Sequence, residues 1–392
     1  MSEVALIGEV CEVVNGATPK TATESFWGGD IQWITPAEMG GLASPYLART
    51  KRTLTDEGLS SCSARLLPPQ SVILSSRAPI GHLVINTEPM ATNQGCKGLV
   101  PNNDLDSKFL FYYLQSIRER LNDLGSGTTF LELSASKLRQ VPIPLPPLNE
   151  QRRIVATLDE ALGEIGELKR NRQAKIEAFD DVKASMLTEL LYPNPGAAAK
   201  EWQTVRLGEA FPTKTGGTPP KSEADNYGDF LPFAKPPELN SAVINSTPDG
   251  LSKHGAAGAR TAPPGSILVS CIGVLGKVGK VGRLLAFNQQ INAILPNNDV
   301  AVPDFVFYVA ESPSFQRQLH ELATGTTVPI VNKSKFNSIQ LLLPPLDEQR
   351  RIVATLDEAA LAVDSGKAAG TEELKLADAM ASSLMTELLT AA

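Results

Sequence analysis

The sequence is poor in the residues that build metal and redox sites. Its 392 residues include only four cysteines and three histidines. No two cysteines form a Cys-x-x-Cys pair, and no histidine has a second ligand at zinc spacing. We therefore expect no metal site and no disulfide framework, but four reduced thiols in a cytoplasmic protein.

Long apolar runs are also absent. No window holds the roughly 18 apolar residues that a membrane span needs, and residues 1–10 lack the basic start and apolar run of a signal peptide. The pattern favours cytoplasmic localisation without a membrane partner.

Local signatures of catalysis are missing as well. The Gly-rich run 276–282 lacks the Gly-Lys-Ser/Thr ending of a phosphate-binding loop and is more typical of a turn between strands. The run 192–196 contains Asn-Pro but not the Asn-Pro-Pro-aromatic tetrapeptide with which amino-methylating enzymes hold their target. A nucleophile and base that meet only in the fold would leave no such signature. We interpret the chain as non-catalytic.

What the chain does contain is a long internal repeat. The 18 residues from Leu145 to Leu162 recur from Leu343 to Ala360 with 16 identities, and residues 185–191 are echoed by residues 383–389. The first pair of segments is 198 positions apart (343 − 145), and so is the second (383 − 185). A whole segment is therefore duplicated.

Each duplicated segment reads as one long helix. The paired prolines that open it cannot lie inside a helix, Asn149 and Asp347 can cap one, and nothing interrupts residues 150–191 or 348–389. Apolar residues recur in alternating steps of three and four, which predicts a coiled-coil seam. The seam comprises Val155, Leu158, Leu162, Ile165, Ile176, Phe179, Met186 and Leu190 in the first helix, and Val353, Leu356, Ala360, Val363, Leu374, Ala377, Leu384 and Leu388 in the second.

Large seam residues in the first helix match small ones in the second. This favours pairing of the two helices in antiparallel order, with Phe179 near Ala360 and with Lys169 and Lys367 flanking the midpoint. The alternative is that each helix packs on its own globular domain.

The segments between the helices read as two related α/β (α+β) domains. The first has short β-like runs at 31–34, 71–74, 82–85 and 98–100 and a helical pattern over 107–124. The second repeats its skeleton loosely; for example, Asn288-Gln289 answers Asn93-Gln94. We predict domains at 1–145 and 196–342 and helical segments at 146–195 and 343–392, giving a pseudo-twofold internal repeat.

The net charge of −7 lies in the duplicated segments. Residues 1–145 carry 12 basic and 14 acidic side chains, and residues 196–345 carry 13 and 11, so these two segments together are neutral. The domains are thus free to present basic patches.

The motif Leu-Pro-Pro-Leu-x-Glu-Gln-Arg-Arg-Ile, present at Leu145 and again at Leu343, closely resembles the DNA specificity subunits of type I restriction–modification systems. The resemblance covers essentially the whole chain. It implies two target recognition domains, each reading one half of a bipartite asymmetric site, and two helices that form an antiparallel coiled-coil spacer. It also implies two methyltransferase subunits, two restriction subunits and double-stranded DNA as partners, with S-adenosylmethionine and ATP/Mg on those subunits and no cofactor in this chain.

Candidate DNA contacts are Lys and Arg residues with Thr helpers in loop-like stretches. The candidates are Thr18, Lys20, Arg49, Lys51, Arg52, Arg77 and Thr128 in the first domain, and Thr218, Lys221, Lys235, Lys277, Lys280, Thr327 and Lys333 in the second. The competing interpretation of each is a solvated surface charge or a turn residue.

The polar residues of the repeated motif are candidates for partner docking, because neither a helix start nor a seam requires the same polar residues twice. They are Glu150, Gln151, Arg152 and Arg153, with Glu348, Gln349, Arg350 and Arg351. A recent duplication is the competing explanation. Two other functions stay open: a protein-binding scaffold without DNA readout, and a stand-alone methyltransferase, which the missing motifs disfavour.

Overall fold

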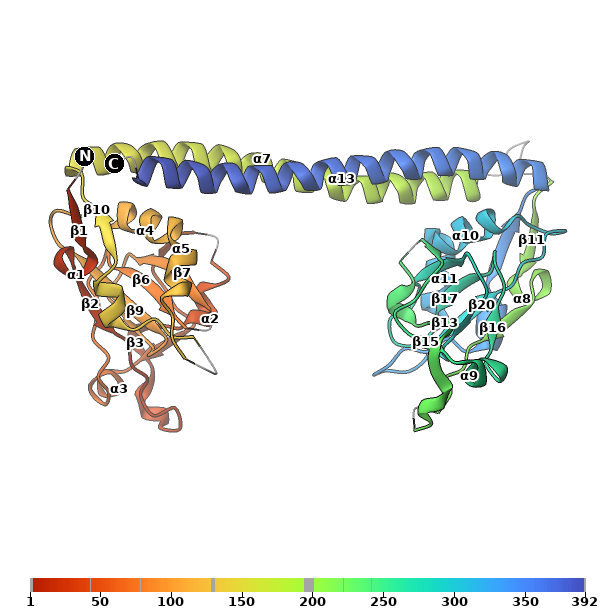
Figure 1. Ribbon diagram of the computed structural model, residues 1–392, viewed down its shortest axis with the longest axis horizontal. Helices are drawn as coiled ribbons and strands as arrows, with labels where there is room; N and C mark the ends of the chain where they lie inside the picture. The colour runs from red at the N-terminus through yellow and green to blue at the C-terminus, as the bar shows by residue number, and fades with distance from the viewer. Residues whose placement is uncertain are drawn as a thin grey trace. The chain divides into compact units, whose positions relative to one another are not determined.

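The computed structural model describes residues 3–42, 44–77, 79–127, 131–193, 201–220, 222–240 and 242–390. It divides into two compact units. Unit 1 comprises Met1–Arg172 with Glu372–Ala392, and unit 2 comprises Gln173–Thr371. Each unit holds one α/β domain and parts of both long helices, and the chain shows the predicted fold class (Figure 1).

Unit 1 is built on a five-stranded and a three-stranded mixed sheet. The five-stranded sheet has the order β2 (Cys11–Asn15), β9 (Cys96–Pro101), β6 (Val72–Ser76), β7 (Ile80–Asn86), β4 (Tyr46–Leu47). The second sheet has the order β5 (Arg52–Leu54), β3 (Trp27–Ile34), β8 (Met90–Thr92), and the terminal strands β1 (Val4–Leu6) and β10 (Pro142–Pro144) pair separately. The four predicted β-like runs overlap β3, β6, β7 and β9.

Unit 2 repeats the five-stranded sheet of unit 1 and has one more strand in its smaller sheet. Its five-stranded sheet has the order β12 (Thr213–Thr215), β20 (Ile291–Ile294), β17 (Ile267–Ser270), β18 (Val278–Val281), β14 (Val243–Ile244). Its second sheet has the order β15 (Gly250–Leu251), β13 (Tyr227–Ala234), β19 (Leu285–Phe287), β16 (Thr261–Ala262). The strands β11 (Gln203–Arg206) and β21 (Gln340–Leu343) pair separately. The Gly-rich run 276–282, expected to be a turn between strands, mostly forms β18, and only Gly276 and Lys277 precede the strand.

Short helices flank the sheets. Those of unit 1 are α1 (Ile7–Val10), η1 (Glu24–Phe26), α2 (Pro36–Met39), α3 (Asp56–Ser60), α4 (Ser107–Ser116), α5 (Arg118–Asp123) and α6 (Ala135–Arg139). Those of unit 2 are α8 (Leu207–Ala210), η3 (Ala224–Asn226), η4 (Pro236–Glu238), α9 (Lys253–Ala257), α10 (Pro303–Glu311), α11 (Pro313–Glu321) and α12 (Lys333–Asn337). The single helix predicted over 107–124 is divided between α4 and α5, because Ile117 (φ −100°, ψ 20°) leaves helical geometry.

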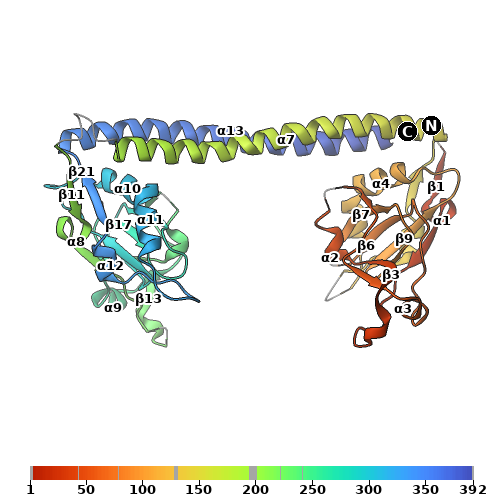
Figure 2. The ribbon, with the colours of Figure 1, turned by 180° about the vertical axis from the view of Figure 1, so that it is seen from behind.

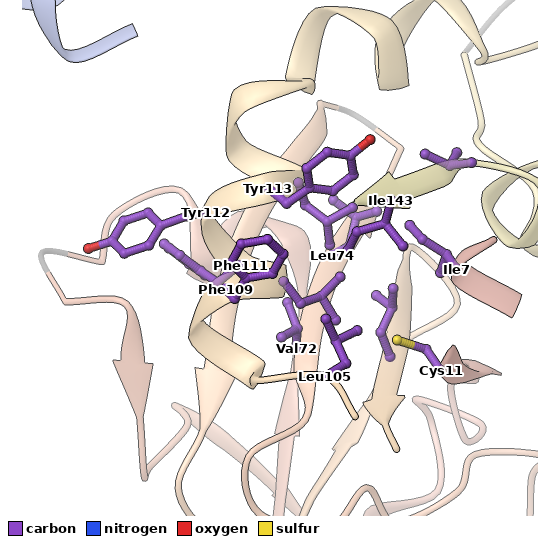
Figure 3. Packing of buried hydrophobic residues seen from close by; sticks show 14 of the residues in the cluster. Ile7, Cys11, Val72, Leu74, Leu105, Phe109, Phe111, Tyr112, Tyr113 and Ile143 are labelled. Carbon is purple, nitrogen blue, oxygen red and sulfur yellow. The ribbon is translucent and has the colours of Figure 1, made fainter. Parts of the chain in front are cut away.

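Helix α4 closes the core of unit 1. Phe109 and Leu110 are fully buried in one cluster with Val72 and Leu74 of β6 (Figure 3). Burying a side chain of this size contributes roughly 1.5–3 kcal/mol. The core therefore fixes α4 against the sheet, and α4 in turn offers its outer residues to the long helices.

The two long helices are α7 (Leu148–Leu191) and α13 (Leu346–Thr390). Each begins before the predicted cap, so that Asn149 and Asp347 lie in the first turn. The carbonyl of Pro147 accepts hydrogen bonds from the Glu150 and Gln151 amides instead. None of the helices within the described ranges combines the length and apolar character required to cross a membrane.

Within each unit, one long helix lies antiparallel to the other, and both pack on the domain. In unit 1 the cluster that contains Phe109 also holds Ile154 and Leu158 of α7 and Met385 and Leu389 of α13. The end of α13 lies beside the first half of α7 (Figures 1 and 2). Helix pairing and packing on a domain, which the sequence presented as alternatives, therefore coexist.

Candidate nucleic-acid interface and helix starts

The basic candidates in unit 1 gather around the β4–β5 connection and the loop after β2. Arg49 and Lys51 are exposed, and the Arg52 guanidinium carbon lies 3.7 Å from the ring centroid of Trp27. This cation–π contact orients Arg52 without removing its charge from solvent. Lys20 is exposed beyond β2. These four cations remain available to an anionic partner.

Arg77 has a different environment from the other unit 1 candidates. Its Nη1 lies 3.8 Å from Glu132, whose other carboxylate oxygen lies 3.7 Å from the buried Lys97 Nζ. Burial lowers the pKa of Lys97, and the Glu132 carboxylate opposes that shift. Arg77 thus shares its acidic partner with a second cation. Thr128 lies outside the described residues.

The candidates of unit 2 are divided between paired and solvent-facing groups. Lys235 forms an ion pair with Asp249, and Lys280 forms one with Asp304. Lys277, Thr327 and Lys333 are exposed. Lys221 lies outside the described residues.

The two units share a contact of which sequence reasoning selected the threonine but not the glutamine. The Thr18 hydroxyl is hydrogen-bonded to the Gln94 Oε1, and the Thr218 hydroxyl is hydrogen-bonded to the Gln289 Oε1. Both glutamines are exposed. The signal was present in the sequence, because Asn93-Gln94 and Asn288-Gln289 are among the few short echoes between the two domains.

At the helix starts, Gln151 and Gln349 are completely buried and bonded within their own units. Gln151 Nε2 donates to the carbonyls of Asp104 and Pro146 at 2.8 Å, and its Oε1 accepts from the Asp106 amide at 2.8 Å. Gln349 makes the equivalent bonds to Val300, Pro344 and Val302 at 2.9–3.0 Å. Both glutamines therefore anchor a helix start to its domain and are not available at the surface, unlike the other docking candidates.

The remaining polar residues of the motif lie at or near the surface. Arg153 donates two hydrogen bonds to Glu150, at 2.8 and 2.6 Å, and Arg351 donates two to Glu348, at 2.9 and 2.5 Å. The hydrogen bonds from the guanidinium lower the pKa of each carboxyl. Arg152 and Arg350 are exposed, and Arg350 donates to Asp347 at 2.7 Å.

A second anchor lies two turns further along each helix. The Tyr112 hydroxyl donates to Asp159 of α7 at 2.5 Å, and the Tyr308 hydroxyl donates to Asp357 of α13 at 2.6 Å. Burial raises the pKa of both tyrosines, and the neighbouring carboxylates add to the rise. The phenols therefore stay protonated and remain donors at neutral pH.

The seam residues are all buried or half-buried, but the helices pair with an offset. Lys169 Nζ lies 2.5 Å from Asp378, and in unit 2 Lys367 forms the corresponding pair with Asp180. Lys169 is 21 residues after the start of α7, whereas Asp378 is 12 residues before the end of α13, so the first nine residues of α7 extend beyond α13. Phe179 consequently packs against Gly366, where a Cβ would lie 2.3 Å from the ring, rather than beside Ala360.

Within the described ranges, no group of three or more His, Cys, Asp or Glu side chains could hold a metal ion. Burial raises the pKa of the Cys11, Cys96 and Cys271 thiols to about 12. These thiols are therefore protonated at neutral pH, and thiolate chemistry has no support in their surroundings.

Comparison with known proteins gives one consistent result. The family model for the type I restriction modification DNA specificity domain matches residues 2–178 and 199–372. The chain is 32% identical over 267 residues to the MjaIX specificity subunit of Methanocaldococcus jannaschii, a match that covers 64% of this chain and 61% of that subunit. It is 35% identical over 147 residues to the HindI specificity subunit of Haemophilus influenzae, covering 36% of this chain and 32% of that one.

The fold also has a counterpart among solved structures. A chain from a study of complex assembly and conformational transition of the type I R-M system superposes with a TM-score of 0.80 at 21% identity, covering 99% of this chain and 97% of that chain. At this identity the likeness establishes the fold.

Proposed function

The chain belongs to the family of type I restriction modification DNA specificity domains, and we propose that it is the specificity subunit that recognises the DNA target of such a system. Each α/β domain reads one half of a bipartite, asymmetric site. The chain is itself non-catalytic and binds no cofactor; S-adenosylmethionine and ATP with magnesium belong to partner subunits. The two segments 146–195 and 343–392 act as spacer and docking elements between domains 1–145 and 196–342.

One observation carries this proposal: the two units share the strand order of their five-stranded sheets but differ in the groups that they present to solvent. In unit 1 Arg49, Lys51 and Arg52 form an exposed basic run. In unit 2 Lys235 is instead paired with Asp249, and the exposed cations include Lys277 and Lys333. A reader of two unlike half-sites needs this combination of a common scaffold and different surfaces.

The helix starts support the docking of two copies of one partner, which we propose to be the methyltransferase subunit, with two restriction subunits joining the complex. The first turns of each long helix carry the same exposed residues, Arg152 and Arg153 in α7 and Arg350 and Arg351 in α13. In each unit these turns lie beyond the end of the other helix, so the seam does not cover them.

The docking proposal is tested by charge reversal at equivalent positions. We expect Arg152→Glu to remove one methyltransferase subunit from the purified complex, and Arg152→Glu with Arg350→Glu to remove both, measured as complex mass in solution. The control is Arg170→Glu, an exposed change in the middle of α7. Full recovery of both subunits by the double variant would favour simple duplication as the origin of the repeat.

The function itself is tested by binding to duplex DNA. We expect the complex, purified through a tag on this chain, to bind specific duplexes in a gel-shift assay. The logarithm of the binding constant should fall linearly with the logarithm of the salt concentration. A complex that keeps its protein partners but binds no DNA would instead support a scaffold whose domains bind proteins.

A further inference from the structure

We propose that Gln94 and Gln289 occupy corresponding base-reading positions in the two domains, where each amide reads the major-groove edge of an adenine. Thr18 and Thr218 are the positioning residues that orient these amides. This inference rests on the proposed function, since it names the side chains that would carry sequence recognition in each half-site.

The first glutamine is held at the tip of a tight turn. The Cys96 amide donates to the Asn93 carbonyl at 3.1 Å, which closes a four-residue turn with Gln94 at its second position. The Asn93 side chain accepts from the Gly95 amide at 2.9 Å and so stabilises the turn. Gln94 itself is exposed at this turn.

The second domain builds the same turn from different residues. The Ile291 amide donates to the Asn288 carbonyl at 3.2 Å, and the Asn288 side chain accepts from the Gln290 amide at 3.1 Å. Gln289 therefore stands at the second position, as Gln94 does. The two turns share only the Asn-Gln pair: Gln290 stands where Gly95 follows Gln94 in the first domain.

In each unit, a glycine two residues before the threonine lets the loop that carries the threonine approach the turn closely. A Cβ at Gly16 would lie 1.8 Å from the Asn93 carbonyl oxygen, and one at Gly216 would lie 2.0 Å from that of Asn288. No side chain fits there. The close approach places the Thr18 hydroxyl on the Gln94 Oε1 and the Thr218 hydroxyl on the Gln289 Oε1.

The hydrogen bond from threonine leaves the amide equipped for one kind of base. A glutamine amide offers an oxygen with two lone pairs and two N–H donors. When the threonine hydroxyl occupies one lone pair, the oxygen can still accept from adenine N6 while Nε2 donates to N7, the bidentate pairing that distinguishes adenine in the major groove. Fixing the amide beforehand also lowers the entropy lost on binding.

Positive charge lies beside both turns. Arg77 Nε would lie 3.4 Å from a Cβ at Gly95, and Lys20 is exposed two residues after Thr18. In unit 2 Arg260 is exposed and donates to the Thr215 carbonyl at 2.8 Å. Cations placed next to a neutral reading group suit phosphate contacts that position a base contact.

The experiment selects duplexes from a library with a random 40-bp core, using the complete complex purified through a tag on this chain. We expect the wild-type complex to enrich an adenine in each half-site. Gln94→Arg should replace that adenine by guanine in one half-site only, with a change in preference of about 5- to 150-fold, and Gln289→Arg should do so in the other. The matched control Gln140→Arg adds the same charge at an exposed glutamine of unit 1 and should leave the selected sequence unchanged.

The threonines are tested by Thr18→Val and Thr18→Ser. Valine should weaken the preference for adenine in that half-site, and serine, which keeps the hydroxyl, should restore it. If both glutamine variants select the wild-type sequence, the inference is overturned while the proposed function stands. If the wild-type complex selects no sequence, both fall. Equal behaviour of valine and serine at position 18 would refute the positioning role.

Discussion

Replacing Gln151 with leucine will lower the unfolding free energy of unit 1 by about 3 kcal/mol. Leucine keeps the volume of the side chain but cannot form hydrogen bonds. The change leaves the Asp106 amide and the carbonyls of Asp104 and Pro146 without the partners that they have at 2.8 Å. Each buried unsatisfied group costs about 1–3 kcal/mol, and the added apolar burial offsets part of the sum.

The effect should concentrate on the attachment of α7 to α4. Asp106 caps α4 by accepting from the Lys108 and Phe109 amides, so Gln151 connects the start of α7 to the residue that caps the core helix. Losing that connection frees both helix starts at once. The helix itself should persist, because leucine has a high helix propensity.

The assay is urea unfolding followed by tryptophan fluorescence, to which unit 1 contributes Trp27 and Trp33. With a urea slope of about 2–3 kcal/mol per molar, the midpoint should fall by about 1–1.5 M. Arg152→Ala, an exposed change one residue away, should change the unfolding free energy by less than about 0.5 kcal/mol. A leucine variant no less stable than this control would refute the reasoning.

Three further predictions concern unit 1. Lys169→Asp should lower the unfolding free energy by about 0.5 kcal/mol in low salt, because the new carboxylate repels Asp378. The charge swap, Lys169→Asp with Asp378→Lys, should restore the wild-type melting temperature. A swap variant as unstable as the single variant would contradict this pairing. Burial raises the pKa of Tyr112 above its unfolded value of about 10, so the stability that Tyr112 provides is present below pH 10 and lost as pH rises through the higher folded pKa. A plot of unfolding free energy against pH should therefore be flatter in alkali for Tyr112→Phe than for the wild type. Identical plots would exclude this contribution. Lys51→Ala should weaken binding to all duplexes alike and reduce the salt slope by about one, whereas an effect confined to one sequence would indicate base reading instead.

The long helices were predictable because their signals are local. Helical periodicity, opening prolines and an uninterrupted run over 150–191 lie within one stretch of sequence, and α7 extends only two residues beyond the predicted start. The offset between the helices was not predictable. At this offset Ile154, Leu158, Met385 and Leu389 pack in one cluster with the domain core, and that packing joins residues far apart in the chain.

The residues of the candidate site could likewise be predicted only where their signal is local. Exposed basic residues such as Lys51 could be proposed from composition, but the fate of Gln151 could not, because a glutamine in a repeated motif looks the same whether it faces solvent or satisfies three buried backbone groups. The Thr18–Gln94 contact joins positions 76 residues apart. Only the fold brings such pairs together.

The most direct test of the central claim is the mapping of methylated adenines across the genome of a host that carries this chain with its partner subunits. We expect one bipartite, asymmetric sequence to be methylated and to lose methylation when this chain alone is deleted. An unchanged methylation pattern after the deletion would contradict the account.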